Sequence, residues 1–326
     1  MTRLMDRTFW GLTIALILLL GLNFALEDWM RGIGLQSLAR GVVAIGLLIL
    51  WRTGLVSFGH ALFFGFGAYT VAMLQILGIN DILLLLIAGS VTAGLLAYVL
   101  GLLLRQYRAI FFALLNLAFS MILYGVLAKL EALGSTDGIG IEQTTFLGFA
   151  PEGENYQITL FVFAAVFAYI AAVAAHWYLK STLGMMTMAV RENEIRVEYL
   201  GYSAERAIHV KYVISGVLAG LGGVIMALTI GHVDPDSMVY WPVSGDFVFI
   251  TILAGTGNVG ATFIGALVYE LLRTYAFEYA PEIWQLILGG SLLLIIMFLP
   301  DGLWSIRDEW KKRRASIRTT ETRAAE

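Results

Sequence analysis

Long apolar runs separated by short polar segments extend along almost the whole chain. Ten runs can be distinguished, over residues 9–26, 38–51, 59–79, 82–104, 109–130, 157–179, 210–230, 244–256, 261–276 and 283–299. A helix of about 20 residues crosses the hydrocarbon layer of a bilayer, and backbone groups in lipid must find their hydrogen bonds within the protein. The pattern therefore predicts an all-α polytopic membrane protein with about ten transmembrane helices. The runs 38–51, 244–256 and 261–276 are short, which favours half-helices or re-entrant segments there.

Composition supports this class and leaves no room for a large soluble domain. Hydrophobic residues make up 59% of the 326 residues and charged residues only 14%. We expect one transmembrane domain over residues 1–304, interrupted by an outer loop at about 131–156 and an inner loop at about 180–209. A basic cytoplasmic tail, residues 305–326, follows it.

The distribution of charge predicts the orientation of the chain. If the N-terminus is cytoplasmic and the ten helices alternate, every Lys and Arg except Arg31, Arg40, Lys129 and Arg273 falls on the inner side. Most acidic residues outside the inner loop and tail then fall on the outer side. This asymmetry is the one that the positive-inside rule describes, so we predict that both termini are cytoplasmic.

Cysteine and histidine usage limits the chemistry that the chain can carry. There is no cysteine, which excludes disulfides and thiolate metal sites. The four histidines, His60, His176, His209 and His232, have no metal-ligand spacing. No convergent set of catalytic side chains is visible, so we predict neither a metal site nor an enzyme.

Polar residues within the apolar runs are costly in lipid and should contact a protein partner or a water-filled cavity. Ser57, His60, Asn116 and Ser120 are the main candidates. For His60, a hydrogen bond to a neighbouring helix and a position lining a cavity are equally good explanations. The outer segment GSTDGIGIEQ, which contains Thr136 and Asp137, is either a surface loop or the lining of a gate.

Two acidic residues also fall within the runs. Glu270 lies three residues before Arg273, a spacing that predicts an ion pair along one helix face, whereas Asp246 lies near the expected edge of the membrane.

Small residues recur at helical spacing in two runs. Ala61, Gly65, Ala68 and Ala72 form one stripe, and a second stripe contains Gly216, Gly220, Gly223 and Ala227. Small side chains allow the backbones of neighbouring helices to approach closely, so both stripes predict tight helix packing.

The inner loop KSTLGMMTMAVRENEIRVEYLGYSAERAIHVK mixes apolar and charged residues in a way that predicts short amphipathic helices. Gly201 is suited to end one of these helices and Ser203 to cap the next. The charges are mixed in sign, which favours docking into a groove of a partner protein over binding to anionic lipid.

Six segments, in order, resemble a known family. The branched-chain amino acid ABC transporter permease family of the LivM kind has segments similar to LWRTGLVSFGHALFFGFGAYT, NLAFSMILYG, STDGIGI, STLGMMTMAVRENEIRVEYLG, VKYVISGVLAGLGGVIMAL and the final FLPDGLW. The resemblance covers about residues 40–304. Two positions depart from the family pattern, Arg52 and the segment AGTGNVGATFIGA.

The resemblance implies a type II ABC importer-like permease that works with other chains. These are a LivH-like second permease, two ABC ATPase subunits and an extracytoplasmic solute-binding protein, all at a bacterial or archaeal cytoplasmic membrane. ATP and Mg²⁺ would be bound by the ATPases, in agreement with the absence of a Gly-x4-Gly-Lys-Ser/Thr phosphate loop, and this chain would bind no cofactor. Carried onto this sequence, the coupling residues are Met188, Arg191, Glu192, Asn193, Glu194, Ile195 and Gly201.

The expected function is inward movement of a small polar solute by ATP-driven alternating access. The solute would resemble a branched-chain amino acid, although the family also includes members for urea, amides and organic acids. The candidate pathway residues are Ser57, His60, Asn116, Ser120, Thr136 and Asp137. The alternatives are an ion-coupled secondary transporter acting alone, for which only Asp246 and Glu270 are suitable acidic groups, and a passive channel.

Overall fold

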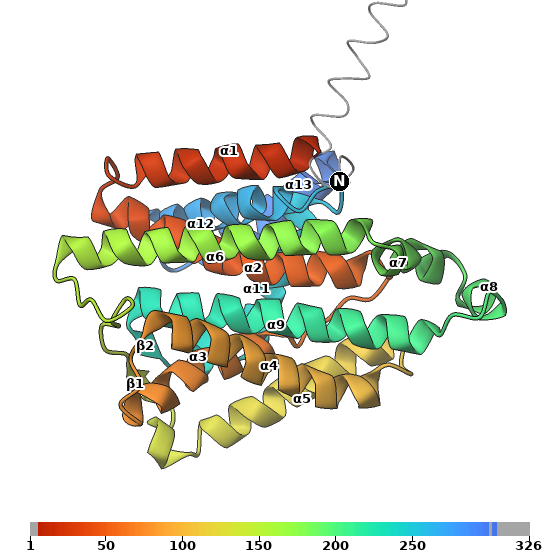
Figure 1. The fold of residues 1–326 in the computed structure, drawn as a ribbon, viewed down its shortest axis with the longest axis horizontal. Helices are drawn as coiled ribbons and strands as arrows, with labels where there is room; N and C mark the ends of the chain where they lie inside the picture. Colours follow the sequence, from red (N-terminus) through yellow and green to blue (C-terminus); the bar gives the residue numbers. More distant parts are fainter. Residues whose placement is uncertain (1–5, 300–301, 305–326) are drawn as a thin grey trace, which may run out of the picture.

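The computed structural model describes residues 6–299 and 302–304, so the predicted basic tail lies outside the described residues. Within them the chain is almost entirely helical (Figure 1). The helices are α1 (Arg7–Leu22), α2 (Asp28–Trp51), α3 (His60–Ile76), α4 (Ile82–Leu104), α5 (Ala109–Leu127), α6 (Glu154–Lys180), α7 (Thr182–Glu192), α8 (Glu194–Tyr199), α9 (Ala204–Ile230), α10 (Pro235–Met238), α11 (Trp241–Ala254), α12 (Ala261–Tyr279) and α13 (Trp284–Phe298). A 3-10 helix, Glu131–Leu133, and two short strands, β1 (Ile139–Gly140) and β2 (His232–Val233), complete the set.

Each predicted apolar run coincides with a helix, and most helices lie side by side along the long axis (Figure 1). By length and apolar composition, five single helices could cross a membrane: α2, α4, α5, α6 and α9. A sixth candidate is the segment Pro235–Ala254, which joins α10 and α11. α1, α3 and α13 are shorter apolar helices. The structure therefore supports a multi-pass helical membrane protein, while the full count of ten crossings and the orientation remain predictions.

The prediction that residues 38–51 form only a half-helix or a re-entrant segment was wrong. α2 has 24 residues and begins at Asp28, ten residues before the apolar run. Arg31 made the first part of α2 look polar, and Arg40 lies within the run, but both are buried and paired: Arg31 contacts Asp28 and Glu154, and Arg40 contacts Glu270. Likewise α12 extends to Tyr279, whereas α11, with 14 residues, is short as expected.

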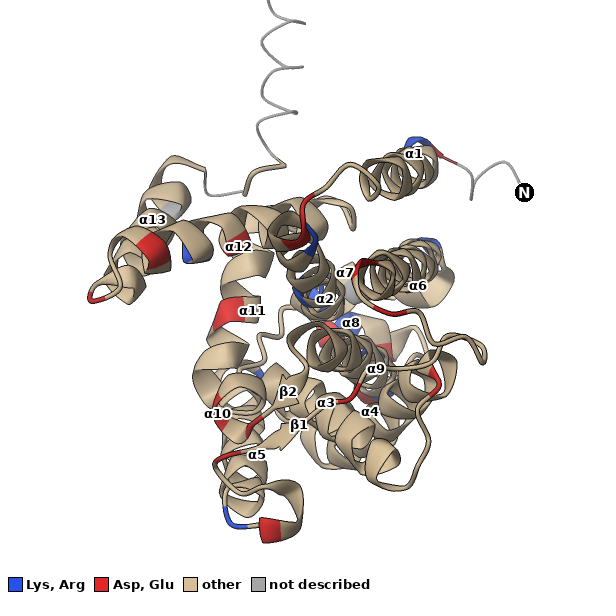
Figure 2. Ribbon diagram, turned by 90° about the vertical axis from the view of Figure 1, so that its left-hand side faces the viewer, with Lys and Arg blue, Asp and Glu red and all other residues tan. Residues whose placement is uncertain are grey.

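α9 lies at the centre of the bundle and packs against α2, α3 and α4 (Figure 2). Its predicted small-residue stripe makes the closest contacts. A Cβ on Gly220 would lie 2.4 Å from Cβ of Ala93 in α4, and a Cβ on Gly223 would lie 1.9 Å from the carbonyl oxygen of Phe64 in α3. On α3 the close approach to α9 is made by Gly67, outside the predicted stripe, while Gly65 packs against Val239.

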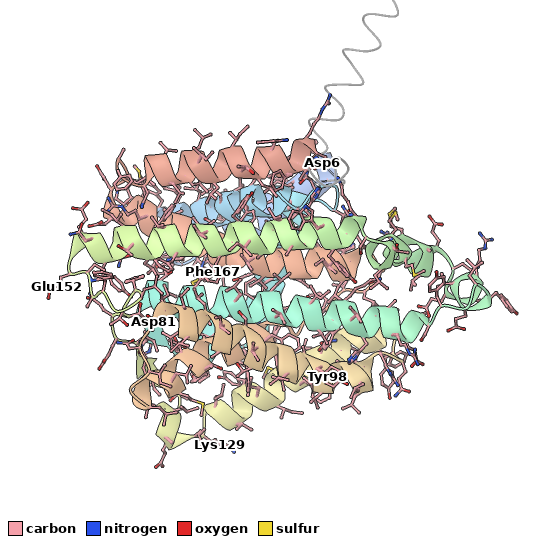
Figure 3. The ribbon with its side chains drawn as sticks, in the orientation of Figure 1. Asp6, Asp81, Tyr98, Lys129, Glu152 and Phe167 are labelled. Carbon is pink, nitrogen blue, oxygen red and sulfur yellow. The ribbon has the colours of Figure 1, made fainter. Side chains whose placement is uncertain are left out.

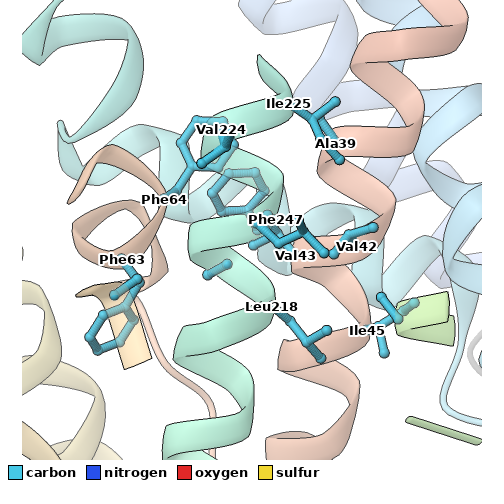
Figure 4. Close-up of a cluster of buried hydrophobic side chains, with 14 of the residues drawn as sticks. Ala39, Val42, Val43, Ile45, Phe63, Phe64, Leu218, Val224, Ile225 and Phe247 are labelled. Atoms are coloured by element: carbon cyan, nitrogen blue, oxygen red, sulfur yellow. The ribbon is translucent and has the colours of Figure 1, made fainter. Parts of the chain in front are cut away.

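Branched and aromatic side chains fill the space around these backbone contacts. Figure 4 shows Val42 and Val43 of α2, Phe64 of α3, Leu218 of α9 and Phe247 of α11 in one cluster, and all five are buried. The core therefore joins helices from the first and second halves of the chain.

The two ends of the bundle are marked by ion pairs. At one end, Asp6 contacts Lys180 and His176, with 3.0 Å between Asp6 Oδ1 and His176 Nε2. At the opposite end, Arg31 pairs with Glu154 at 3.0 Å. In Figure 3, Asp6 lies at the end that carries α7 and α8, and Asp81 and Glu152 lie at the other.

Candidate functional site

The polar candidates lie around a break between two helices. After α2 ends, residues 53–59 are not helical and run back into the bundle. α3 therefore begins at His60 inside the bundle, away from the end that carries α7 and α8 (Figure 1). A Cβ on Gly59 would lie 2.3 Å from the carbonyl oxygen of Asn116, near the middle of α5. Non-helical backbone at membrane depth is tolerated only where protein or a water-filled cavity surrounds it. Here the protein surrounds it, since Leu55 and Ser57 are buried.

His60 is fully buried and makes a hydrogen bond between helices. Its Nε2 lies 2.5 Å from the hydroxyl of Ser215 in α9, while its Nδ1 has no hydrogen-bond partner in the described part of the chain. Phe63 packs edge-on against the imidazole at 6.0 Å. Of the two explanations for His60, the structure supports the hydrogen bond to a neighbouring helix.

The other three intramembrane candidates are buried in similar contacts. Asn116 accepts a hydrogen bond from the Tyr212 hydroxyl at 2.5 Å and donates one to the carbonyl of Phe112 at 2.7 Å. Ser120 donates to the carbonyl of Val239 at 2.9 Å. The Ser57 hydroxyl accepts from the Gly59 amide at 3.3 Å.

Three partners in this cluster were not singled out from the sequence: Tyr212, Ser215 and Ser244. Ser244, in α11, accepts a hydrogen bond from the Ala61 amide at 2.9 Å and so joins α11 to the first turn of α3. Serine is common in buried helix contacts and carries little sequence signal. Tyr212 and Ser215 lie three residues apart in the run 210–230. This spacing places both on one face of a helix and could have indicated a polar face. We call this set the polar seam, defined as Ser57, His60, Asn116, Ser120, Tyr212, Ser215 and Ser244.

Thr136 and Asp137 are not part of the polar seam. Both are exposed, in the turn between the 3-10 helix and β1. This turn packs against the start of α10, because a Cβ on Gly138 would lie 2.3 Å from the Val233 carbonyl oxygen. β1 and β2 pair antiparallel, with Ile139 opposite Val233. The structure thus separates the outer candidates from the buried ones.

A buried ion pair joins α2 to α12. Arg40 Nη1 lies 2.6 Å from Glu270 Oε1, and both side chains are more than nine-tenths buried. The prediction that Glu270 pairs with Arg273 was wrong, because Arg273 instead lies over the ring of Trp284, 5.9 Å from its centroid. Helical spacing showed a possible partner on the same helix but could not show a stronger one on a different helix.

The inner loop forms two short helices that project from one end of the bundle (Figure 1). Asn193 separates α7 from α8 and caps α8 by accepting a hydrogen bond from the Arg196 amide at 3.0 Å. Gly201 has φ +85° and ends this segment, and Ser203 caps α9 by accepting from the Arg206 amide at 3.3 Å. The predicted helices, the helix end and the cap are confirmed.

Charged contacts hold this projection against the bundle. Glu194 pairs with Arg108, which precedes α5, at 2.6 Å. Arg191 packs over Gly54, where a Cβ would lie 3.3 Å from its Cγ. Glu192 is exposed.

An exposed apolar surface remains on the projection. Val190 and Val197 point inward and are buried, but Met188 and Ile195 are 59% and 64% exposed. We call the exposed set the coupling surface, and it consists of Leu183, Met185, Met188, Ile195, Tyr199 and Leu200. An apolar patch outside the membrane core and bounded by charges is typical of a protein interaction site.

Comparison with known proteins agrees with this architecture. Residues 30–297 match the family described as the branched-chain amino acid transport system permease component. The chain is 27% identical over 290 residues to the LivM permease protein of Escherichia coli (strain K12). The matched region covers 80% of this chain and 67% of that protein. It is 22% identical over 298 residues to the LivH permease protein of Salmonella typhimurium, covering 86% and 95%.

A shorter match links the chain to a nucleoside ABC transporter permease, NupB of Lactococcus lactis, with 32% identity over 127 residues that cover 38% of this chain and 33% of that protein. No solved structure matches the chain. The relatives are transport permeases rather than enzymes. Since the family match covers most of the sequence, the chain belongs to the permease component family of branched-chain amino acid transport systems.

Proposed function

We propose that this chain is a permease subunit of an ABC importer that moves a small polar solute, of the branched-chain amino acid kind, into the cell by ATP-driven alternating access. The observation that carries the proposal is the coupling surface, an apolar face on two short helices that the ion pair between Glu194 and Arg108 joins to the bundle. Such a projection can transmit the movement of a docked protein to α5 and α9, because Glu194 contacts Arg108 before α5 and α8 leads directly into α9.

The proposed complex contains a LivH-like second permease, two ATPases that bind ATP and Mg²⁺, and a solute-binding protein on the outer side. The family match and the resemblance to both LivM and LivH support this assignment. The ATPases would dock at the coupling surface, with Met188 and Ile195 as apolar anchors. Asn193 would set the angle between α7 and α8, and Gly201 the turn from α8 to α9.

The polar seam has a place in this mechanism. It surrounds the interrupted backbone between α2 and α3, connects α3 to α9 and α11, and connects α9 to α5. Discontinuous helices at the membrane midplane recur at transporter substrate sites. The proposal therefore retains Ser57, His60, Asn116 and Ser120 beside the pathway, with Thr136 and Asp137 at its outer mouth.

A charge placed on the coupling surface tests the docking role. Met188→Asp and Ile195→Asp should abolish co-purification of the ATPases under mild detergent, because a carboxylate would be buried without a partner in the docked interface. The melting temperature of the solubilised chain should not change, since both side chains are exposed.

Phe149→Asp is the matched control, because Phe149 is an exposed apolar residue outside the coupling surface. Co-purification of the ATPases with the Met188→Asp and Ile195→Asp variants at the level of the unchanged chain would refute docking at this surface.

A further inference from the structure

α11 presents a carboxylate on an otherwise apolar exposed face. Asp246 is half-buried and shares this face with Trp241 and Phe249, which are also exposed, and with Gly245, where a Cβ would meet nothing within 4 Å. Phe247 and Ser244, on the other side of the helix, are buried in the bundle. In Figure 2, α11 lies between α12 and α10.

Behind Asp246 lies the buried ion pair of Arg40 and Glu270. Arg40 is near the midpoint of α2, and its guanidinium carbon lies 5.4 Å from the centroid of the Tyr269 ring. Asp246 is close enough to Arg40 and Tyr269 to interact electrostatically with both. Glu270 is the direct partner of Arg40. Asp246 itself forms no ion pair within 4 Å in the described part of the chain.

The Tyr269 hydroxyl is the second unusual group here. Tyr269 is 2% exposed, and its hydroxyl makes no hydrogen bond of good geometry within the described residues, although Asp246 lies beside it. A hydroxyl beside a carboxylate is placed to hydrogen-bond with it, so Tyr269 can orient Asp246 for a ligand.

Asp246 is a poor match for a lipid-facing position. A carboxylate in contact with acyl chains is strongly unfavourable, and intramembrane acidic residues almost always face protein or water. The helix is also interrupted nearby, because α10 ends at Met238 and α11 begins at Trp241, less than two turns before Asp246. Interrupted membrane helices of this kind form solute sites in transporters.

We propose that Asp246 binds the positively charged amino group of the transported solute, in a water-filled pathway along the exposed face of α11, with the Tyr269 hydroxyl as an additional polar contact. The ligand class is a small zwitterion with an ammonium group. Arg40 supplies a positive charge near the carboxylate, while Glu270 balances the charge of Arg40. The inference rests on the proposed importer function and specifies its solute.

Access to water is the first test. The chain has no cysteine, so Asp246→Cys introduces a single thiol. In proteoliposomes containing the assembled complex, we expect a trimethylammonium methanethiosulfonate reagent to modify this thiol, and saturating leucine with its binding protein to slow the reaction. Leu286→Cys, on the exposed face of α13, should react at least about tenfold more slowly, since a lipid-facing thiol remains protonated.

A thiol at position 246 that reacts no faster than the one at 286 overturns the proposal, because α11 would then face lipid or a closely packed partner subunit. Modification that leucine does not slow overturns the assignment of Asp246 to the solute site.

Transport is the second test. Asp246→Asn keeps the shape of the side chain and removes its charge, so ATP-driven leucine uptake should fall by about tenfold or more, the effect of losing a hydrogen bond to a charged group. Asp246→Glu should retain part of the uptake, and Glu278→Gln, an exposed acidic residue at the end of α12, should retain all of it.

Normal uptake by Asp246→Asn would overturn this inference and leave the importer function intact. If the complex without any substitution takes up no leucine in the presence of ATP, the proposed function itself is contradicted. If Asp246→Asn fails to assemble, the cysteine labelling decides.

Discussion

At the scale of single residues, buried polar groups connect helices that are distant in the sequence. Arg40 and Glu270 join α2 to α12, and His60 and Ser215 join α3 to α9. Each of these groups would be costly alone in the membrane interior, so the partners depend on each other. The following two predictions measure that dependence.

Glu270→Gln should destabilise the solubilised chain by about 3–5 kcal/mol, because it leaves the Arg40 guanidinium buried beside a neutral amide. The double variant Arg40→Met with Glu270→Leu should recover most of the loss, since it removes both charges. Thermal unfolding in detergent measures both effects, with Glu278→Gln as the exposed control. Equal stability of Glu270→Gln and the unchanged chain would show that the pair is not formed.

Ser215→Ala removes the hydroxyl that contacts His60 and little else. Interhelical hydrogen bonds in membranes contribute about 0.6 kcal/mol on average and up to about 1.7 kcal/mol, so a stability loss in this range is expected, with uptake per folded complex retained. A variant with normal stability and no uptake would assign this pair to the pathway instead of to helix packing.

At the scale of helices, the closeness of α9 to α3 and α4 depends on the absence of side chains. A Cβ on Gly223 would clash with the carbonyl of Phe64, whereas Gly125, two residues before the end of α5, is exposed and a Cβ there would meet nothing within 4 Å. The same glycine-to-alanine change should therefore have opposite effects at the two positions.

Gly223→Ala should destabilise the bundle by about 1–3 kcal/mol, because the helices must separate to admit the methyl group. Gly125→Ala should be neutral or stabilise α5 by up to about 1 kcal/mol, because alanine loses less backbone entropy in a helix. Denaturation in mixed micelles compares the two variants. Similar effects at both positions would contradict the close contact between α9 and α3.

At the scale of the whole molecule, the apolar runs predicted the helices well, and the places where they failed have a common cause. Runs over α4 and α9 carry no charge in their middle, so their helices could be read directly. Arg31, with the polar residues Asp28, Gln36 and Ser37, hid the first ten residues of α2, because hydropathy counts each charge as if it were unpaired, although Glu154 on α6 neutralises Arg31. The start of α3 inside the bundle depends on packing against Asn116 and Ser215, which no local pattern encodes.

The helices of the inner loop were predicted more completely than the polar seam. The cap residue Ser203 and the φ > 0 glycine Gly201 act on neighbouring residues, so the local sequence determines them. The polar seam is built from contacts between four helices. From the sequence, Ser57, His60, Asn116 and Ser120 could be identified, but their partners Tyr212, Ser215 and Ser244 could not.

The central claim, that this chain is one subunit of an ATP-driven importer, is tested most directly by solute uptake into proteoliposomes of defined composition. Vesicles with this chain, the second permease and the ATPases should accumulate leucine delivered by the binding protein only when ATP is present on the ATPase side. Vesicles with this chain alone should accumulate none. Leucine uptake by the isolated chain, driven by an ion gradient or by no energy source, would contradict the account.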